Sequence, residues 1–298
     1  GASVIPAAAA KVIAAHGGKV LVSAEVDEIL VTNGTAHGVR MADGRELLAD
    51  RIVSGAGVHV TYGSLLPDHV AQDIGADELL DKVERSFGHL SLYLGLDGTA
   101  EELGLEKPNL WIYPSDDFDG NMDAFEADPD APLPLTYISF PSAKDPDFEV
   151  RHPGHSTIDV IVPAKHEWFA EWDGTRWHKR GDAYDARKKQ FTDRMLEHVF
   201  THVPSAKDHL DVIEASTPLT TQHFMNYGGG ELYGLNHNAQ RFAQTWLRPR
   251  TPVKGLYLTG QDVFTAGVAA AMFGGALTAS AMIGPDLIAK ALRRKLPG

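Results

Sequence analysis

The 298 residues include no cysteine, and this absence excludes several kinds of chemistry at once. Disulfides, thiolate catalysis, iron–sulfur clusters and cysteine-ligated zinc all need the thiol. Positive charge is also scarce, because 27 Lys and Arg stand against 40 Asp and Glu, for a formal net charge of −13. Nucleic acids are bound through clustered basic faces, and anionic lipid surfaces attract broad positive ones. Neither is therefore predicted as the main partner.

Long hydrophobic runs are few. The longest, residues 266–283, is rich in Gly and Ala and contains Thr278 and Ser280. A membrane span needs about 20 strongly apolar residues, so a buried helix is the better prediction. Gly1 opens the sequence without the basic segment of a secretory signal. We therefore expect a cytoplasmic globular protein, and leave peripheral contact with a membrane open.

The first part of the chain alternates between helix and strand signals. Alanine-rich sequence up to a Gly-Gly pair predicts a helix, and Asn33-Gly34 and Asp43-Gly44 predict tight turns between short strands. The last strand ends in Gly55-Ala56-Gly57. The predicted elements are a helix at 3–16 and strands at 19–23, 25–32, 36–41 and 51–54.

The middle of the chain has a different pattern. Strands separated by Pro- and Asp-rich loops predict a mostly antiparallel sheet. An amphipathic pattern predicts a long helix over 182–202, and the acidic segment 115–134 reads as a surface excursion. The remaining predicted elements are a helix at 73–85 and strands at 89–96, 110–113, 135–140 and 156–162.

The last part returns to the first pattern, with a short buried strand at 255–260, a loop, and the helix over 266–283. Lys290, Arg293, Arg294 and Lys295 would suit a helix C-terminus. The backbone N–H groups of residues 267–269 would lie at the positive end of the 266–283 helix, where an anion or electron-rich ring edge is stabilised. A tight strand–helix packing unit that binds nothing explains the same pattern. Spacing alone leaves both readings open.

Metal and nucleophile motifs are not found. His152 and His155 are three residues apart, and His198 and His202 four apart, but neither pair has the H-E-x-x-H pattern or an evident third ligand. No G-x-S-x-G elbow is present either. We therefore name no metal site and no catalytic side chain.

The run Gly-Leu-Tyr-Leu-Thr-Gly-Gln-Asp-Val-Phe-Thr-Ala-Gly at 255–267 resembles the C-terminal flavin motif of retinol saturases. That family is grouped with phytoene desaturases and carotenoid isomerases. Four more segments resemble the same family: Phe140–Pro146, Pro163–Trp172, Ser216–Thr220 and Tyr233–His237. The resemblance covers effectively the whole chain. It implies FAD as cofactor, with NAD(P) left open as electron partner.

The resemblance also implies roles for individual residues. Val26 would meet the adenine ring, Gly55 and Ala56 the adenosine part, and Gly260 and Asp262 the pyrophosphate and ribityl chain. The edge of the isoalloxazine would face Gly267, Val268 and Ala269. An apolar substrate channel would be lined by Phe224, Tyr227, Tyr233, Phe264, Met272 and Phe273.

One part of the family pattern is missing. Members begin with a strand, a G-x-G-x-x-G turn and a helix, which cradle the pyrophosphate. The nearest match here, Gly55-Ala56-Gly57, has Val60 in place of the third glycine. The chain is therefore expected to hold the downstream part of such an enzyme, with a truncated Rossmann segment. Alone it should bind FAD weakly, lack turnover, and aggregate or self-associate through the uncovered surface.

Together these observations predict an α/β plus α+β fold, with a partial FAD-binding domain of the glutathione reductase type and an inserted antiparallel-sheet substrate domain. The predicted segments are 1–68 and 226–298 for the FAD-binding domain and 69–225 for the substrate domain. The predicted function is flavin-dependent oxidoreduction of CH–CH bonds in a polyene or other long apolar substrate. Two alternatives stay open: a non-enzymatic fragment or hydrophobic-ligand binder without flavin, and a carotenoid isomerase. Substrate, direction of electron transfer and oligomeric state are not determined by the sequence.

Overall fold

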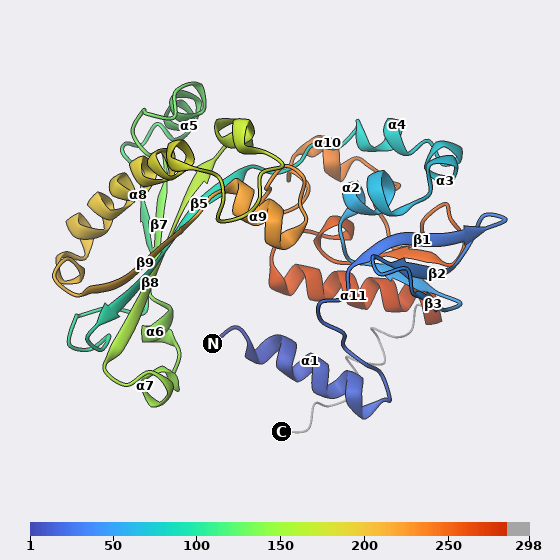
Figure 1. The fold of residues 1–298 in the computed structure, drawn as a ribbon, viewed down its shortest axis with the longest axis horizontal. Coiled ribbons are helices and arrows are strands. Elements are labelled where there is room, and N and C mark those ends of the chain that lie inside the picture. Colours follow the sequence, from blue (N-terminus) through green and yellow to red (C-terminus); the bar gives the residue numbers. More distant parts are fainter. Residues whose placement is uncertain (285–298) are drawn as a thin grey trace. The chain divides into compact units, whose positions relative to one another are not determined.

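The computed structural model describes residues 1–284, and the chain divides into two compact units (Figure 1). Unit 1 comprises residues 1–20 and 87–232, and unit 2 comprises residues 21–86 and the chain from Tyr233 onwards. Each unit has its own hydrophobic core. No helix within the described range is long and apolar enough to cross a membrane.

The boundaries of these units differ from the predicted segments in three places. Residues 226–232, predicted with the last segment, group with unit 1. Residues 69–86, predicted in the middle segment, belong to unit 2 because Val70, Ala76 and Val83 are buried in its core. Residues 1–20, predicted with the first segment, group with unit 1. The functional labels given to the segments stay predictions.

Unit 1 is built on a five-stranded sheet in the order β6–β7–β8–β5–β9, in which all neighbouring strands run antiparallel. This confirms the antiparallel sheet predicted for the middle of the chain. The edge strand β9 was not predicted. The strands are β5 (Gly88–Asp97), β6 (Leu110–Ile112), β7 (Thr136–Ser139), β8 (His155–Ala164) and β9 (Leu210–Ser216).

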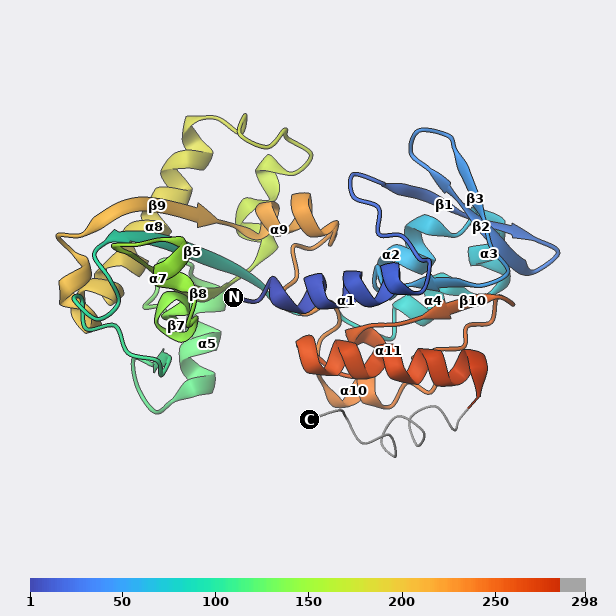
Figure 2. The same cartoon turned by 90° about the horizontal axis from the view of Figure 1, so that it is seen from below.

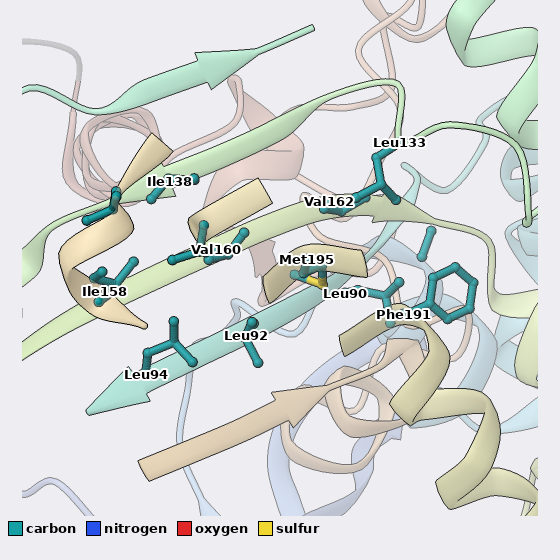
Figure 3. Packing of buried hydrophobic residues seen from close by; sticks show 14 of the residues in the cluster. Leu90, Leu92, Leu94, Leu133, Ile138, Ile158, Val160, Val162, Phe191 and Met195 are labelled. Atoms are coloured by element: carbon teal, nitrogen blue, oxygen red, sulfur yellow. The ribbon is translucent and has the colours of Figure 1, made fainter. Parts of the chain in front are cut away.

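The core of unit 1 forms where the apolar face of a strand packs against the apolar face of a helix. Every second residue of β5 from Leu90 to Leu96 is a buried leucine, since alternate strand residues point to the same face. Helix α8 (Asp182–His202) lies over this face and contributes Phe191 and Met195, as Figure 3 shows. The helix has the bounds that its amphipathic pattern predicts.

Five shorter helices complete unit 1. The acidic segment 115–134, predicted as a surface excursion, contains α5, which the Asp117 side chain caps by accepting a hydrogen bond from Gly120 N at 3.0 Å. The segment is more than an excursion, because Phe125 on this helix is 1% exposed and belongs to the core. The helices are α1 (Val4–Ala15), α5 (Phe118–Ala127), α6 (Pro141–Lys144), α7 (Phe148–Arg151) and α9 (Pro218–Met225).

Unit 2 begins with an antiparallel meander of β1 (Val26–Thr32), β2 (Thr35–Met41) and β3 (Glu46–Leu48). Asn33 and Gly34 both have positive φ, 50° and 71°, as the predicted two-residue hairpin turn requires. The strand predicted at 19–23 does not form. A strand needs a neighbour for its N–H and C=O groups, and no described segment pairs with these residues.

Two short helices of unit 2, at 58–60 and 239–242, were not predicted, and the helix predicted at 73–85 differs from the structure. Instead of one helix at 73–85, two short helices are separated by Gly75, whose φ of 64° breaks the helical path. The helix predicted over 266–283 is present as α11, beginning after Gly267. The predicted cationic helix end at Lys290–Lys295 lies outside the described residues. The helices are α2 (Val58–Val60), α3 (Asp68–Asp73), α4 (Ala76–Leu80), α10 (Ala239–Phe242) and α11 (Val268–Ile283).

The first and last parts of the chain meet in a two-stranded parallel sheet. Strand β4 (Ile52–Ser54) pairs with β10 (Leu256–Leu258), and Val53 lies opposite Tyr257. This confirms the prediction that the two glycine-ended strands share one structural unit. Helix α11 runs alongside β10 (Figure 2).

Candidate functional site

The two turns that follow β4 and β10 lie at the same edge of their sheet, because the strands are parallel. The pairing continues beyond the strands, since Thr259 N donates to Ser54 O at 2.9 Å. Gly55 and Ala56 follow β4 directly, and residues 260–262 follow β10. Four of the predicted cofactor residues are therefore brought together from distant parts of the sequence.

Helix α11 packs directly on this edge. A Cβ at Gly274 would overlap the carbonyl oxygen of Gly260 and would lie only 3.2 Å from Gly260 N. One turn further along, Thr278 Oγ1 donates to Leu258 O at 2.8 Å. A residue without a side chain at position 274 is therefore what allows the helix to approach the turn.

The N-terminus of α11 carries no side-chain cap. Gly267 stands at the N-cap position with a φ of 95°, and Val268 is 62% exposed. The first N–H groups of a helix have no intrahelical acceptor, and they carry its positive partial charge. The predicted residues 267–269 thus form an accessible positive helix end.

Asp262 is buried in the turn, with 5% of its surface exposed. Its Oδ2 accepts a hydrogen bond from the backbone N–H of Val58 at 2.9 Å. We predict from the sequence pattern that this carboxylate faces a cavity, but its described contact is with the start of α2. A negative charge at the start of a helix is stabilising, and here the hydrogen bond also ties the turn after β10 to the start of α2.

The other predicted residues are more dispersed. Val26 pairs with Met41 in the three-stranded meander and is not part of the parallel sheet. Phe264 and Phe273 lie together in unit 2, with ring centroids 4.8 Å apart. Met272 and Tyr233 belong to the same unit and are partly exposed. Phe224 and Tyr227 lie in unit 1, so the predicted substrate residues are divided between the two units.

Phe224 and Tyr227 line a cavity of about 760 Å³ in unit 1. Among its lining residues, Phe224 meets Trp177 edge to face with ring centroids 5.1 Å apart, and Trp177 also stacks on His223 at 5.4 Å. Phe224 is 62% exposed. These rings suit a flat or extended apolar ligand.

Polar side chains also line the cavity. The Arg180 guanidinium lies over the Tyr184 ring and donates to Leu219 O at 3.2 Å. His89 on β5 also lines the cavity, on the sheet face opposite the leucines, and burial lowers the pKa of its imidazole. A neutral imidazole can donate or accept a hydrogen bond. His89 was not predicted as a cavity residue, although it directly precedes the alternating leucines of β5.

Two further residues of unit 2 were not predicted. Arg241 on α10 and His237 just before it both bond to the loop that leads into α11. His237 Nε2 accepts a hydrogen bond from Ala266 N at 2.7 Å, so this nitrogen must be unprotonated. Burial, and then the charge of Arg241, lower the pKa of His237.

We expect the stability of unit 2 to decrease on acidification because of His237. Its pKa is lower in the folded state than the unfolded value of about 6.5, so the unfolded state binds the proton more readily. The contribution of His237 is therefore complete above about pH 6.5 and is lost as the pH falls through the folded pKa. Urea unfolding of the wild type and of His237→Gln between pH 5 and 8 measures it. The glutamine amide can still accept from Ala266 N but does not titrate, so a variant with the same acid loss as the wild type would contradict the assignment.

The histidine pairs considered as metal ligands have structural contacts. His198 Nδ1 lies 3.0 Å from Thr136 Oγ1, and His202 Nδ1 lies 2.9 Å from the carbonyl oxygen of His198. Within residues 1–284, no three His, Cys, Asp or Glu side chains are grouped as a metal site requires.

Comparison with known proteins relates the chain to one group of enzymes. No family model matches it. It is 37% identical over 283 residues to an all-trans-retinol 13,14-reductase of Danio rerio, covering 91% of this chain and 46% of that protein. A phytoene desaturase of Rhodobacter capsulatus is 30% identical over 285 residues, covering 94% of this chain and 52% of that protein. Over most of its length the chain is similar to members of the retinol saturase and carotenoid desaturase family. It spans about half the length of these relatives.

Similarity to this family does not by itself establish that a protein is an active enzyme. Another relative, 34% identical over 297 residues and covering 95% of this chain and 48% of the relative, is an inactive all-trans-retinol 13,14-reductase of Danio rerio. An oxidoreductase of Methanosarcina mazei has a similar fold, with a TM-score of 0.57 at 18% identity, over 91% of this chain and 51% of that one. A putrescine oxidase variant gives 0.53 at 11% identity, over 93% and 51%. The predicted combination of an α/β unit with an antiparallel-sheet unit is thus confirmed.

Proposed function

We propose that this chain is the part of an FAD-dependent oxidoreductase that holds the isoalloxazine end of the flavin and the apolar substrate. The reaction is the reduction or desaturation of a carbon–carbon bond in a polyene or other long apolar molecule. The proposal rests on one observation: the parallel pairing of β4 with β10 gathers Gly55, Ala56, Gly260 and Asp262 at the sheet edge on which α11 packs.

The residues at this edge fit a flavin. The uncapped start of α11 offers N–H groups of residues 268–270 to an electron-rich ring edge or an anion. Gly267 and the alanines that follow it are small, so a flat ring can approach the backbone. When bound, FAD would supply the hydride chemistry, and this chain's residues would bind it, orient it and exclude water. This division of labour needs no side-chain acid or base.

Flavin binding tests the proposal directly. We expect FAD fluorescence to be quenched saturably as the purified protein is added, with the weak affinity expected for the chain alone, and the visible absorption of the flavin to be perturbed at high protein concentration. Bleaching of that absorption by NADH or NADPH would identify the electron partner. A protein that binds no flavin at micromolar concentration would contradict the proposal and favour the hydrophobic-ligand binder.

The cavity of unit 1 is proposed to hold the apolar part of the substrate. Phe224 and Tyr227 line it, and the polar side chains of His89 and Arg180 suit a single polar end. The apolar side chains near the start of α11, Phe264, Met272 and Phe273, are proposed as further substrate contacts. Because the proposed substrate is apolar, the proposal includes peripheral contact of the protein with a membrane.

Removing the exposed ring at position 224 should weaken binding of an apolar ligand with little cost in stability. Phe224→Ala is expected to raise the dissociation constant for all-trans-retinol about tenfold, since a lost aromatic contact is worth about 1–2 kcal/mol. Quenching of tryptophan fluorescence, with Trp177 lining the same cavity, measures it. Phe118→Ala is the matched control, because Phe118 is also exposed, at 54%, and meets Tyr113 edge to face. Equal affinities of the two variants would contradict the assignment of the cavity.

The isomerase alternative shares the flavin and the substrate class. It differs in the products: a reductase or desaturase changes the number of double bonds, whereas an isomerase changes only their geometry. Chromatography with mass spectrometry of the products, after incubation with reduced flavoprotein and in parallel with oxidised flavoprotein, separates the two. A new chromatographic peak with the mass of the substrate would favour the isomerase.

A further inference from the structure

Arg241 is a buried cation in the wall of the proposed flavin site. It is 3% exposed, and its Nη2 donates to the carbonyl oxygen of Gln261 at 2.7 Å. The same nitrogen lies 3.3 Å from Asp262 O and 3.4 Å from Phe264 O. Three carbonyl oxygens of one turn therefore converge on a single guanidinium nitrogen. Without a cation there, their partial negative charges would repel one another.

The segment that carries Arg241 is itself anchored. Arg241 N donates to Asn238 Oδ1 at 2.9 Å, and Asn238 Nδ2 donates to Glu84 Oε2 at 2.9 Å. Asn236 Nδ2 donates to the same carboxylate oxygen at 3.1 Å. The backbone that carries the Arg241 side chain is thus held in place by hydrogen bonds.

The loop that leads into α11 is held at a second point by the same segment. His237 Nε2 accepts from Ala266 N, so Arg241 fixes residues 261–264 and His237 fixes residue 266. The next residue, Gly267, is the N-cap of α11. Both ends of the loop between β10 and α11 are therefore determined by side chains of residues 237–241.

Burying a guanidinium is costly, and packing alone would not require it. Burial lowers the pKa of Arg241, and the neighbouring Asp262 carboxylate opposes this. An apolar side chain would fill the same space without that cost. A charged donor can hold several carbonyl groups pointing toward it, because charge-assisted hydrogen bonds are about twice as strong as neutral ones.

We propose that Arg241 is a positioning residue of the flavin site, which sets the shape of the 261–266 loop and thereby the direction of Asp262 and of the first N–H groups of α11. The inference rests on the proposed flavin function. It assigns Arg241 no contact with substrate. Lysine should not replace it, because the lysine ammonium nitrogen is one bond short of the position that Nη2 occupies and is more strongly hydrated than a guanidinium.

The test compares Arg241→Lys with Arg250→Lys. Arg250 is an arginine of the same unit that donates to the carbonyl oxygen of Ala281, near the other end of α11. We expect Arg241→Lys to release FAD about tenfold faster than the wild type and to shift the flavin midpoint potential, with loss of the turn's charge-assisted hydrogen bonds as the cause. Arg250→Lys should keep both values. Wild-type flavin release and potential in Arg241→Lys would overturn the proposal.

Hydrogen exchange of the backbone amides in residues 261–271 gives an independent readout. In the wild type these amides should exchange slowly, and in Arg241→Lys faster, while the amides of β1 and β2 remain unchanged. If the wild type binds no flavin, the proposed function is wrong, and exchange still decides whether Arg241 fixes the loop. Should Arg241→Lys fail to fold, Asn238→Ala removes the side chain that accepts from Arg241 N and is bonded to Glu84, and so loosens the segment that presents the guanidinium. Unchanged exchange and flavin release in that variant would equally overturn the proposal.

Discussion

Replacing Gly274 with alanine is expected to destabilise unit 2 by about 3 kcal/mol, the upper part of the range for overpacked cores. The new methyl group would overlap the carbonyl oxygen of Gly260 and approach its N and C atoms at 3.2 and 3.1 Å. All three are backbone atoms, so no side chain can turn aside. The helix cannot shift freely either, because Thr278 Oγ1 is bonded to Leu258 O. Urea unfolding followed by circular dichroism measures the loss.

The neighbouring glycine provides the matched control. A Cβ at Gly275 meets nothing within 4 Å. Gly275→Ala should therefore stabilise the protein by about 0.5–1 kcal/mol, the ordinary gain from removing a helical glycine. If both variants gain stability, α11 does not pack on the turn as described. We also expect Gly274→Ala, and not Gly275→Ala, to lose FAD, because the displaced helix end and turn belong to the same proposed site.

Those elements whose residues repeat with a regular period were predictable from the sequence. The 3.6-residue pattern of 182–202 predicted α8, and the alternation in 89–96 predicted β5. Asn33-Gly34 predicted its hairpin because both residues tolerate positive φ. The bounds of the helix at 73–85 were wrong. Gly75 in the left-handed conformation separates residues 68–73 from 76–80, and residues 84–86 pair with 234–236, which composition does not report.

The residues of the candidate site also divide into those that local sequence features predicted and those that they did not. The motif at 255–267 was recognisable because its glycines and its strand–helix boundary are local features. Arg241 and His237 were not, since they lie in a segment without regular spacing and become important only through contact with the 261–266 loop. The partner of Asp262 could not be predicted either: Val58 is 204 residues away in sequence and contributes only its backbone N–H. Such a contact leaves no mark on residue types.

Asp262 carries the second large expected effect. Asp262→Ala leaves the N–H of Val58 without its described acceptor, and an unpaired buried donor costs about 1–3 kcal/mol. It also removes the negative charge that raises the pKa of the buried Arg241 guanidinium. We expect a loss of about 2–3 kcal/mol in the free energy of unfolding of unit 2. FAD retention should weaken by about 1–2 kcal/mol, the scale of a charge-assisted hydrogen bond.

Two further variants separate the contributions of Asp262. Asp262→Asn keeps an oxygen that can accept from Val58 N, so most of the stability should return, whereas the lost charge should still weaken FAD retention. Asp43→Ala removes an exposed acid that pairs with Arg45 in the same unit and changes the net charge equally. It should leave both properties unchanged. FAD titrations followed by fluorescence, together with urea unfolding, measure the three variants. Wild-type FAD affinity in Asp262→Ala would mean that this carboxylate acts only on the fold, tying α2 to the turn after β10.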